Sequence, residues 1–120
     1  MAYVDGFVIP VKLTDRQAFI DHARQLDSIM IGEGALRIVG CWADDVPEGK
    51  QNDFYRSVDR QDGETVCFSW IEWPDKTTRD AAFARMGQNE AMMATPMPFD
   101  GKRMIFGGFD PILVLEKSNG

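Results

Sequence analysis

The chain has 120 residues, and its 19 acidic side chains outnumber its 13 lysines and arginines, which gives a net charge of −6 at pH 7. This length fits one domain, and a hydrophobic content of 44% with 27% charged residues is typical of a globular chain. We therefore expect residues 1–120 to form a single domain. The acidic balance argues against nucleic acid or an anionic membrane surface as a partner, because either polyanion would be repelled.

The sequence predicts a cytoplasmic protein. It contains no run of about 18 apolar residues, the length that a membrane-spanning helix needs. Its first residues also lack the basic-then-apolar layout of a signal peptide.

Cysteine and histidine limit the metal and redox chemistry. Cys41 and Cys67 each lie in an apolar, strand-like run, where we expect a buried and inert thiol. A disulfide between them is disfavoured without a secretory signal. His22 is the only histidine, so a centre of two or three histidines within one chain is excluded. Because Asp44 and Asp45 also lack the alternating spacing of a calcium loop, we predict no metal site.

A strand and a helix are predicted first along the chain. Residues 3–11 are apolar on both faces and predict a strand. Residues 14–17 have the Thr-x-x-Gln pattern of a capping box, and the apolar residues that follow recur every three or four positions. We expect a helix that begins there and ends at Gly32 and Gly34, because glycine readily adopts the left-handed conformation after a helix.

Three further strands are predicted in the middle of the chain. Residues 36–43 and 65–73 are rich in β-branched and aromatic side chains, and residues 54–58 predict a short strand between them. In residues 65–73 the side chains alternate: Val66, Phe68 and Trp70 share one face, and Cys67, Ser69, Ile71 and Trp73 share the other. Both faces are largely apolar, so we expect both to be covered.

The last third of the chain predicts a helix and a strand. Asp75 follows Pro74 and is a predicted N-cap of a second helix, which fades near residues 87–89. Residues 104–116 predict the final strand, in which Gly107 and Gly108 indicate a bulge or a close approach of two backbones.

This order of elements is the split β-α-β, or ferredoxin-like, arrangement of an α+β fold. Two helices then cover one face of an antiparallel sheet, and nothing in the chain covers the other. Because the strands are apolar on both sides, we predict that the uncovered face meets a second copy of the protein, which makes a homodimer.

Several runs of residues resemble the YbaA-like family of small bacterial proteins of unknown function. They cover nearly the whole chain: Tyr3-Val4-Asp5-Gly6-Phe7-Val8, Gly34-Ala35-Leu36-Arg37, Cys41-Trp42-Ala43, Phe68-Ser69-Trp70-Ile71, Arg79-Asp80-Ala81, residues 97–105 and Gly107-Gly108-Phe109. The resemblance implies a dimeric α/β-barrel, the superfamily of the antibiotic-biosynthesis-type monooxygenases. It supplies no activity, because a fold does not fix a function.

The same resemblance implies a working cavity between the helices and the sheet, where monooxygenase and haem-degrading members of the superfamily act. His22 lies on the apolar stripe of the first predicted helix and is a weak candidate for a proton shuttle or a haem ligand. The alternative is a core histidine bonded to a carbonyl oxygen.

Five other residues are candidates for holding a ligand. Tryptophan and phenylalanine side chains suit an aromatic pocket, and arginines at strand starts suit a carboxylate or phosphate. The alternatives are core or interface packing for the tryptophans, and ion pairs with Asp5 or Glu72 for the arginines. The five candidates are Trp42, Trp70, Phe83, Arg37 and Arg103.

The function that the sequence favours is therefore a homodimer that binds a small apolar or anionic molecule in this cavity. No cofactor is predicted except haem in the alternative function, a cofactor-independent monooxygenase-like or haem-degrading enzyme. A third reading is an interaction module whose interior is filled.

Overall fold

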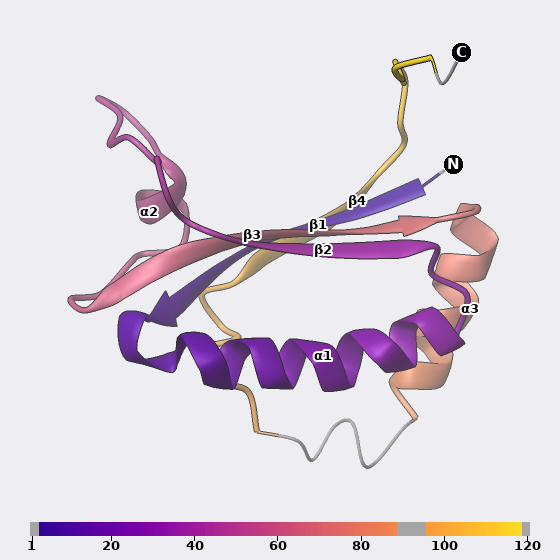
Figure 1. Cartoon of the computed structure of the whole chain (residues 1–120), viewed down its shortest axis with the longest axis horizontal. Coiled ribbons are helices and arrows are strands. Elements are labelled where there is room, and N and C mark those ends of the chain that lie inside the picture. Colours follow the sequence, from indigo (N-terminus) through magenta and orange to yellow (C-terminus); the bar gives the residue numbers. More distant parts are fainter. Residues whose placement is uncertain (1–2, 89–95, 119–120) are drawn as a thin grey trace.

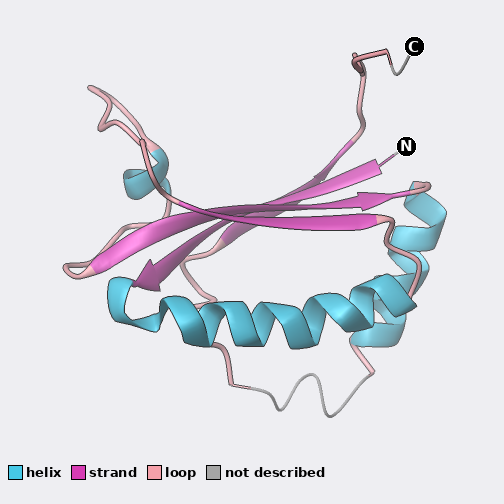
Figure 2. Ribbon diagram, in the orientation of Figure 1, coloured by secondary structure: helices cyan, strands magenta, loops and turns pink. Residues whose placement is uncertain are grey.

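The structure is a computed structural model that describes residues 3–88 and 96–118. Four antiparallel strands form one sheet in the order β2-β3-β1-β4. Two helices, α1 and α3, lie on one side of the sheet, while the short α2 and the C-terminus lie on the other (Figures 1 and 2). This architecture confirms the ferredoxin-like α+β prediction. The elements are β1 (Tyr3–Lys12), α1 (Arg16–Gly32), β2 (Arg37–Trp42), α2 (Phe54–Ser57), β3 (Glu64–Trp73), α3 (Lys76–Met86) and β4 (Ile105–Phe109).

The alternation predicted for residues 65–73 determines which β3 side chains lie on each face of the sheet. In β3, Cys67, Ile71 and Trp73 are buried in the core beneath the helices. Their neighbours Phe68 and Trp70 point to the opposite side, which the helices leave uncovered. We call the two sides the helix face and the open face.

A buried ion pair fixes α3 against the sheet. Asp5 of β1 is 2% exposed, and its carboxylate accepts a hydrogen bond of 2.8 Å from Trp73 Nε1. Arg79 of α3 donates to both oxygens of the same carboxylate, at 3.1 and 2.8 Å. These bonds raise the pKa of Arg79 above its ordinary value. Because every oxygen has a donor, this pair tolerates burial and sets the position of α3.

Both predicted helices begin where expected, α1 at Arg16 and α3 at Lys76, but only one of the two predicted caps forms. The Asp75 carboxylate accepts from the backbone N–H of Thr78 at 2.7 Å, as an N-cap does. At the other start a short 3₁₀ helix, η1 (Leu13–Asp15), precedes α1, and no side chain caps either helix. The predicted capping box at residues 14–17 therefore does not form, because the 3₁₀ turn itself leads the chain into α1.

The turn after α1 requires glycine, as predicted. Gly34 has a φ of +117°, a conformation that other residues rarely adopt. A Cβ at this position would lie 2.7 Å from Thr78 Cγ2, so α3 also leaves no room for a side chain.

The strand predicted at residues 54–58 is wrong, because the segment forms the helix α2. One oxygen of the Asp53 carboxylate accepts from the backbone N–H of Arg56 at 2.7 Å, and the other accepts from Gly49 at 3.1 Å. This N-cap starts a helical turn that outweighs the strand preference of the aromatic residues.

The last strand is shorter than predicted, because β4 ends at Phe109 and residues 110–116 belong to no strand. Pro111 has no N–H to donate to a sheet. Gly107 and Gly108 stay in register with Gly6 and Asp5, so no bulge forms. A close approach does occur, because a Cβ on Gly108 would collide with the Tyr3 ring.

Candidate functional site

A cavity of about 440 Å³ lies between the two large helices and the sheet. The described lining comes from α1, α3, β1, β4 and the connection between α3 and β4, and all of it except His22 is apolar. The lining residues are Phe7, His22, Leu26, Met30, Phe83, Met86, Gly87, Met97, Met104 and Phe106. The volume is in the range that holds a small organic molecule.

His22 supplies the polar atom of this cavity. Its Nε2 is buried and has no hydrogen-bond partner among the described residues. The Phe99 ring lies edge-on to the imidazole, with 6.0 Å between ring centroids. Burial lowers the pKa of His22 below 6.5, so the imidazole is neutral at pH 7. A buried polar atom without a partner is costly, which makes Nε2 the natural hydrogen-bonding point for a bound molecule.

The aromatic candidates do not meet in one site. Phe83 lines the cavity and packs edge-on against Trp73 at 6.0 Å. Trp42 also lies on the helix face, but at the sheet edge, where its ring is 6.4 Å from Phe19. Trp70 lies on the open face, where its Nε1 donates to Glu72 at 2.9 Å. Only one of the three therefore touches the cavity.

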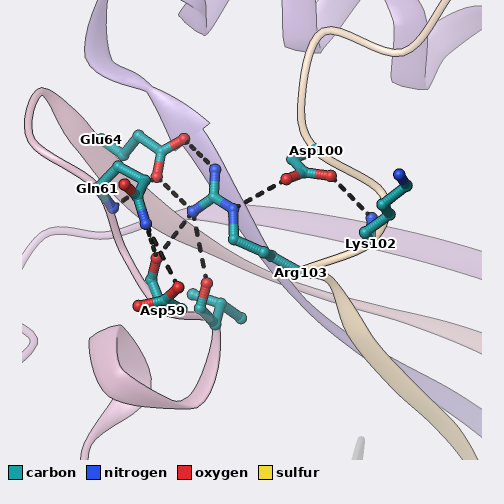
Figure 3. Close-up of polar contacts among 7 residues, drawn as sticks. Asp59, Gln61, Glu64, Asp100, Lys102 and Arg103 are labelled. Carbon is teal, nitrogen blue, oxygen red and sulfur yellow. Dashed lines mark hydrogen bonds and ion pairs between the residues drawn. The ribbon is translucent and has the colours of Figure 1, made fainter.

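Arg103 is occupied by partners within the chain (Figure 3). Two of its nitrogens form hydrogen bonds of 2.7 Å to the two carboxylate oxygens of Glu64. Its Nε donates to Asp100 at 3.0 Å, and Nη1 also donates to the Asp59 carbonyl at 2.9 Å. The hydrogen bond from Arg103 lowers the pKa of Glu64 below its ordinary value. The arrangement is an ion pair, although with Glu64 and not with Asp5 or Glu72.

Arg37 follows the ion-pair alternative with one of the predicted partners. Its guanidinium lies 3.6 Å from the Glu72 carboxylate on the open face, and its side chain is 67% exposed. Neither arginine candidate lines the cavity.

The two cysteines differ, and the prediction is wrong for one of them. Cys67 is fully buried on the helix face, and burial raises the pKa of its thiol to about 12. Cys41 is exposed on the open face, opposite Phe68 in the register of β2 and β3. The apolar run around Cys41 is real, but the helices cover the other side of its strand.

The open face carries a large apolar surface. Phe68 is 44% exposed and Phe109 is 63% exposed. The Phe68 ring lies 6.1 Å from Phe54 of α2 and 5.8 Å from Trp70. The register places the following side chains on this face: Val4, Val8, Arg37, Val39, Cys41, Val66, Phe68, Trp70, Glu72, Ile105 and Phe109. Apolar patches of this kind are typical of protein–protein interfaces.

Sequence reasoning missed most of the cavity. Met30, Met86, Met97 and Met104 all line it, and they come from α1, α3 and the connection between α3 and β4. Met97 lies in a proline-interrupted stretch whose pattern indicates a surface crossing, so no periodicity predicted its place. Across residues 3–88 and 96–118, no cluster of side chains suits a metal ion, and no helix is long and apolar enough to cross a membrane.

Residues 2–101 match the family described as "Protein of unknown function (DUF1428)". The chain belongs to the DUF1428 family. This DUF1428 chain is 48% identical over 115 residues to "Uncharacterized protein YbaA" of Escherichia coli K12. The aligned residues cover 94% of this chain and 98% of that protein. YbaA of Shigella flexneri matches over the same 115 residues with the same identity.

Two solved structures share the fold of this DUF1428 chain. Both are described as dimeric ferredoxin-like proteins from an uncultured marine organism. Each comparison covers 98% of this chain and 100% of the other, with TM-scores of 0.52 and 0.54. The sequence identities are 12% and 10%, so the likeness is one of fold alone.

Proposed function

We propose that this DUF1428 protein is a homodimer that binds a small, mostly apolar molecule in the cavity between its helices and its sheet. Residues 1–120 then act as one ferredoxin-like domain, and the cytoplasm is its expected place. The observation that carries the proposal is the apolar cavity of about 440 Å³, in whose wall the His22 Nε2 has no hydrogen-bond partner from residues 3–88 and 96–118.

The lining supports an uncharged ligand more than an anionic one. His22 is neutral at pH 7, and no arginine or lysine belongs to the described lining. An anionic group would therefore enter an apolar site without a cation, which is costly. A ligand with one hydroxyl or amide group suits the cavity best, because that group can form a hydrogen bond with Nε2.

The exposed apolar side chains of the open face support the homodimer, because packing against a second copy would bury them. The two neighbours with the same fold are themselves described as dimeric. We therefore also propose the dimeric α/β-barrel assembly, which light scattering tests: a stable species of 13.5 kDa at micromolar concentration contradicts it.

A second candidate function is favoured by one observation, the free Nε2 of His22. This is the enzymatic alternative, a cofactor-independent monooxygenase-like or haem-degrading activity in which His22 handles a proton. Haem itself suits the cavity poorly, because no basic side chain of the described lining can pair with its propionates. A haem titration that shifts the Soret band in the wild type but not in His22→Ala would revive that role.

Ligand binding is tested with two neutral probes, naphthalene and 1-naphthol, which differ by one hydroxyl group. We expect both to bind, with tighter binding of 1-naphthol, as measured by quenching of tryptophan fluorescence. Leu26→Trp fills the cavity and should weaken both probes at least about tenfold. Ile31→Trp adds the same side chain at an exposed position of the same helix and should leave binding unchanged.

His22→Phe separates the role of the nitrogen from that of the cavity. The substitution keeps an aromatic ring, so naphthalene should still bind, while the preference for 1-naphthol should disappear. Equal binding of both probes to Leu26→Trp and the wild type would show that the probes lie elsewhere. The natural ligand is then sought by native mass spectrometry of the protein purified from its own cell.

A further inference from the structure

The C-terminal segment extends away from the sheet, and its apolar side chains are exposed. After β4, residues 110–118 belong to no helix or strand, and they run away from the sheet on the side of the open face (Figure 1). Ile112 is 94% exposed, Leu113 75%, Val114 49% and Leu115 85%. We call residues 110–116 the tail. Four consecutive apolar residues on a surface indicate a segment that another surface covers.

The composition of the tail favours an added strand. Isoleucine and valine prefer strands, and successive side chains of a strand point to opposite sides. Because all four residues are apolar, such a strand needs apolar surroundings on both of its faces, as buried strands do. A site that covers only one face would leave two of the four side chains in water.

The free edge of β2 offers these two surroundings. On the helix side a groove of about 480 Å³ separates β2 from α1, with apolar side chains on its walls. On the other side lies the open face, with Val39 and Cys41 at this edge. A strand paired with β2 would send alternate side chains into the groove and onto the open face. The groove residues are Arg16, Phe19, Ile20, Ala23, Arg24, Asp27, Ile38, Gly40 and Trp42.

The topology assigns this edge to a second copy. β2 and β4 lie at opposite edges of the sheet, so the tail leaves from the edge that is far from its own β2. When two open faces pack about a two-fold axis along the strands, β4 of one copy comes beside β2 of the other.

We propose that the tail crosses to the second copy in the homodimer and pairs as an added strand with β2 of the partner. This inference rests on the proposed homodimer but makes a separate claim, that the two chains exchange their C-terminal segments. The exchange would bury the apolar tail and remove two free sheet edges at once.

Cysteine cross-linking tests the exchange directly, because Cys41 lies exposed on β2 while Cys67 is buried. Four variants each place one cysteine in the tail: Ile112→Cys, Leu113→Cys, Val114→Cys and Leu115→Cys. A disulfide needs Cα atoms within about 7 Å, so only a tail beside β2 can reach. We expect at least one variant to form a covalent dimer under mild oxidation through the partner's Cys41. The product should vanish when Cys41→Ser is added.

A second measurement covers the case in which the register hinders cross-linking. The double variant with Ile112→Glu and Val114→Glu should raise the dimer dissociation constant at least about 100-fold, because the exchange would bury both charges. Lys117→Glu is the matched control, because it makes the same −2 change in charge directly after the tail and should change the constant less than about threefold.

The outcomes separate the two proposals. A wild type that remains dimeric, with no covalent dimer from the four cysteine variants and an unchanged dissociation constant for the double glutamate variant, overturns the exchange and leaves the dimer standing. A monomeric wild type overturns both. A covalent product that persists with Cys41→Ser also overturns pairing beside β2.

Discussion

The two faces of the sheet carry the same kind of side chain in different surroundings, as two tryptophans of β3 illustrate. Trp73 on the helix face is fully buried, bonded to Asp5 and packed against Phe83. Trp70, three residues earlier on the open face, is half-buried and bonded only to Glu72 of its own strand. Residue type therefore does not distinguish the buried helix face from the partly exposed open face. The side on which α1 and α3 pack makes the difference.

The largest expected effect separates these two tryptophans. Trp73→Ala should lower the free energy of unfolding by about 3–5 kcal/mol, because it leaves a cavity and removes a hydrogen bond from buried Asp5. Trp70→Ala should lower it by less than about 1.5 kcal/mol, because water already reaches that ring. Urea denaturation measures both losses of stability. Both variants are made in the Phe68→Glu chain described next, which is expected to be monomeric, so that dimer dissociation does not contribute. Equal losses would contradict the distinction between the faces.

The next effect concerns the open face alone. Phe68→Glu should raise the dimer dissociation constant at least about 100-fold, about 2.7 kcal/mol, because the charge would be buried in the interface. Analytical ultracentrifugation measures the constant. Leu13→Glu is the control, since Leu13 is 57% exposed in η1, away from the open face, and its variant should remain dimeric.

The same variant should change the reactivity of one cysteine. Cys41 of the dissociated Phe68→Glu chain should react with a thiol reagent at least about ten times faster than in the wild-type dimer. Cys67 should stay unreactive in both, because it is buried and its pKa is about 12. A Cys41 that reacts equally fast in both proteins would show that the dimer uses another surface.

The smallest effect compares two ion pairs of the sheet. Glu64→Gln should lower the free energy of unfolding by about 1–2 kcal/mol at pH 7, because Glu64 is buried with Arg103. The folded-state pKa of Glu64 lies below its ordinary 4.5, so its contribution is present above pH 4.5 and disappears as the pH falls through the lowered value.

Urea denaturation at stepwise lower pH should therefore bring the Glu64→Gln variant and the wild type together. Glu72→Gln, whose partner Arg37 is largely exposed, should cost less than about 0.5 kcal/mol at any pH. A difference between Glu64→Gln and the wild type that persists in acid would contradict the assigned role of the carboxylate.

The sequence predicted what local patterns control. Alternation in residues 65–73 gave the two faces, the Asp75 cap gave the start of α3, and Gly34 gave the end of the first helical region. The order of the elements was enough for the fold. These features depend on neighbours a few residues apart, which is why one sequence reveals them.

The features that the sequence did not predict depend mostly on contacts between distant segments. Arg103 pairs with Glu64, 39 positions away, and nothing in the sequence distinguishes Glu64 from Glu72 as its partner. The Asp53 carboxylate caps α2, whereas the aromatic residues after Asp53 favoured a strand in the sequence. The side on which Cys41 lies follows from the packing of α1, which the strand pattern does not specify.

The methionines of the cavity have a consequence for the range of its ligands. All four methionines among the residues that the structure describes line it, and thioether chains without branches change shape at little cost. Such walls adapt to molecules of different outline, so the cavity would select for size and polarity more than for exact shape. Oxidation to sulfoxide would make the same walls polar, and the cavity would then lose its affinity for apolar molecules.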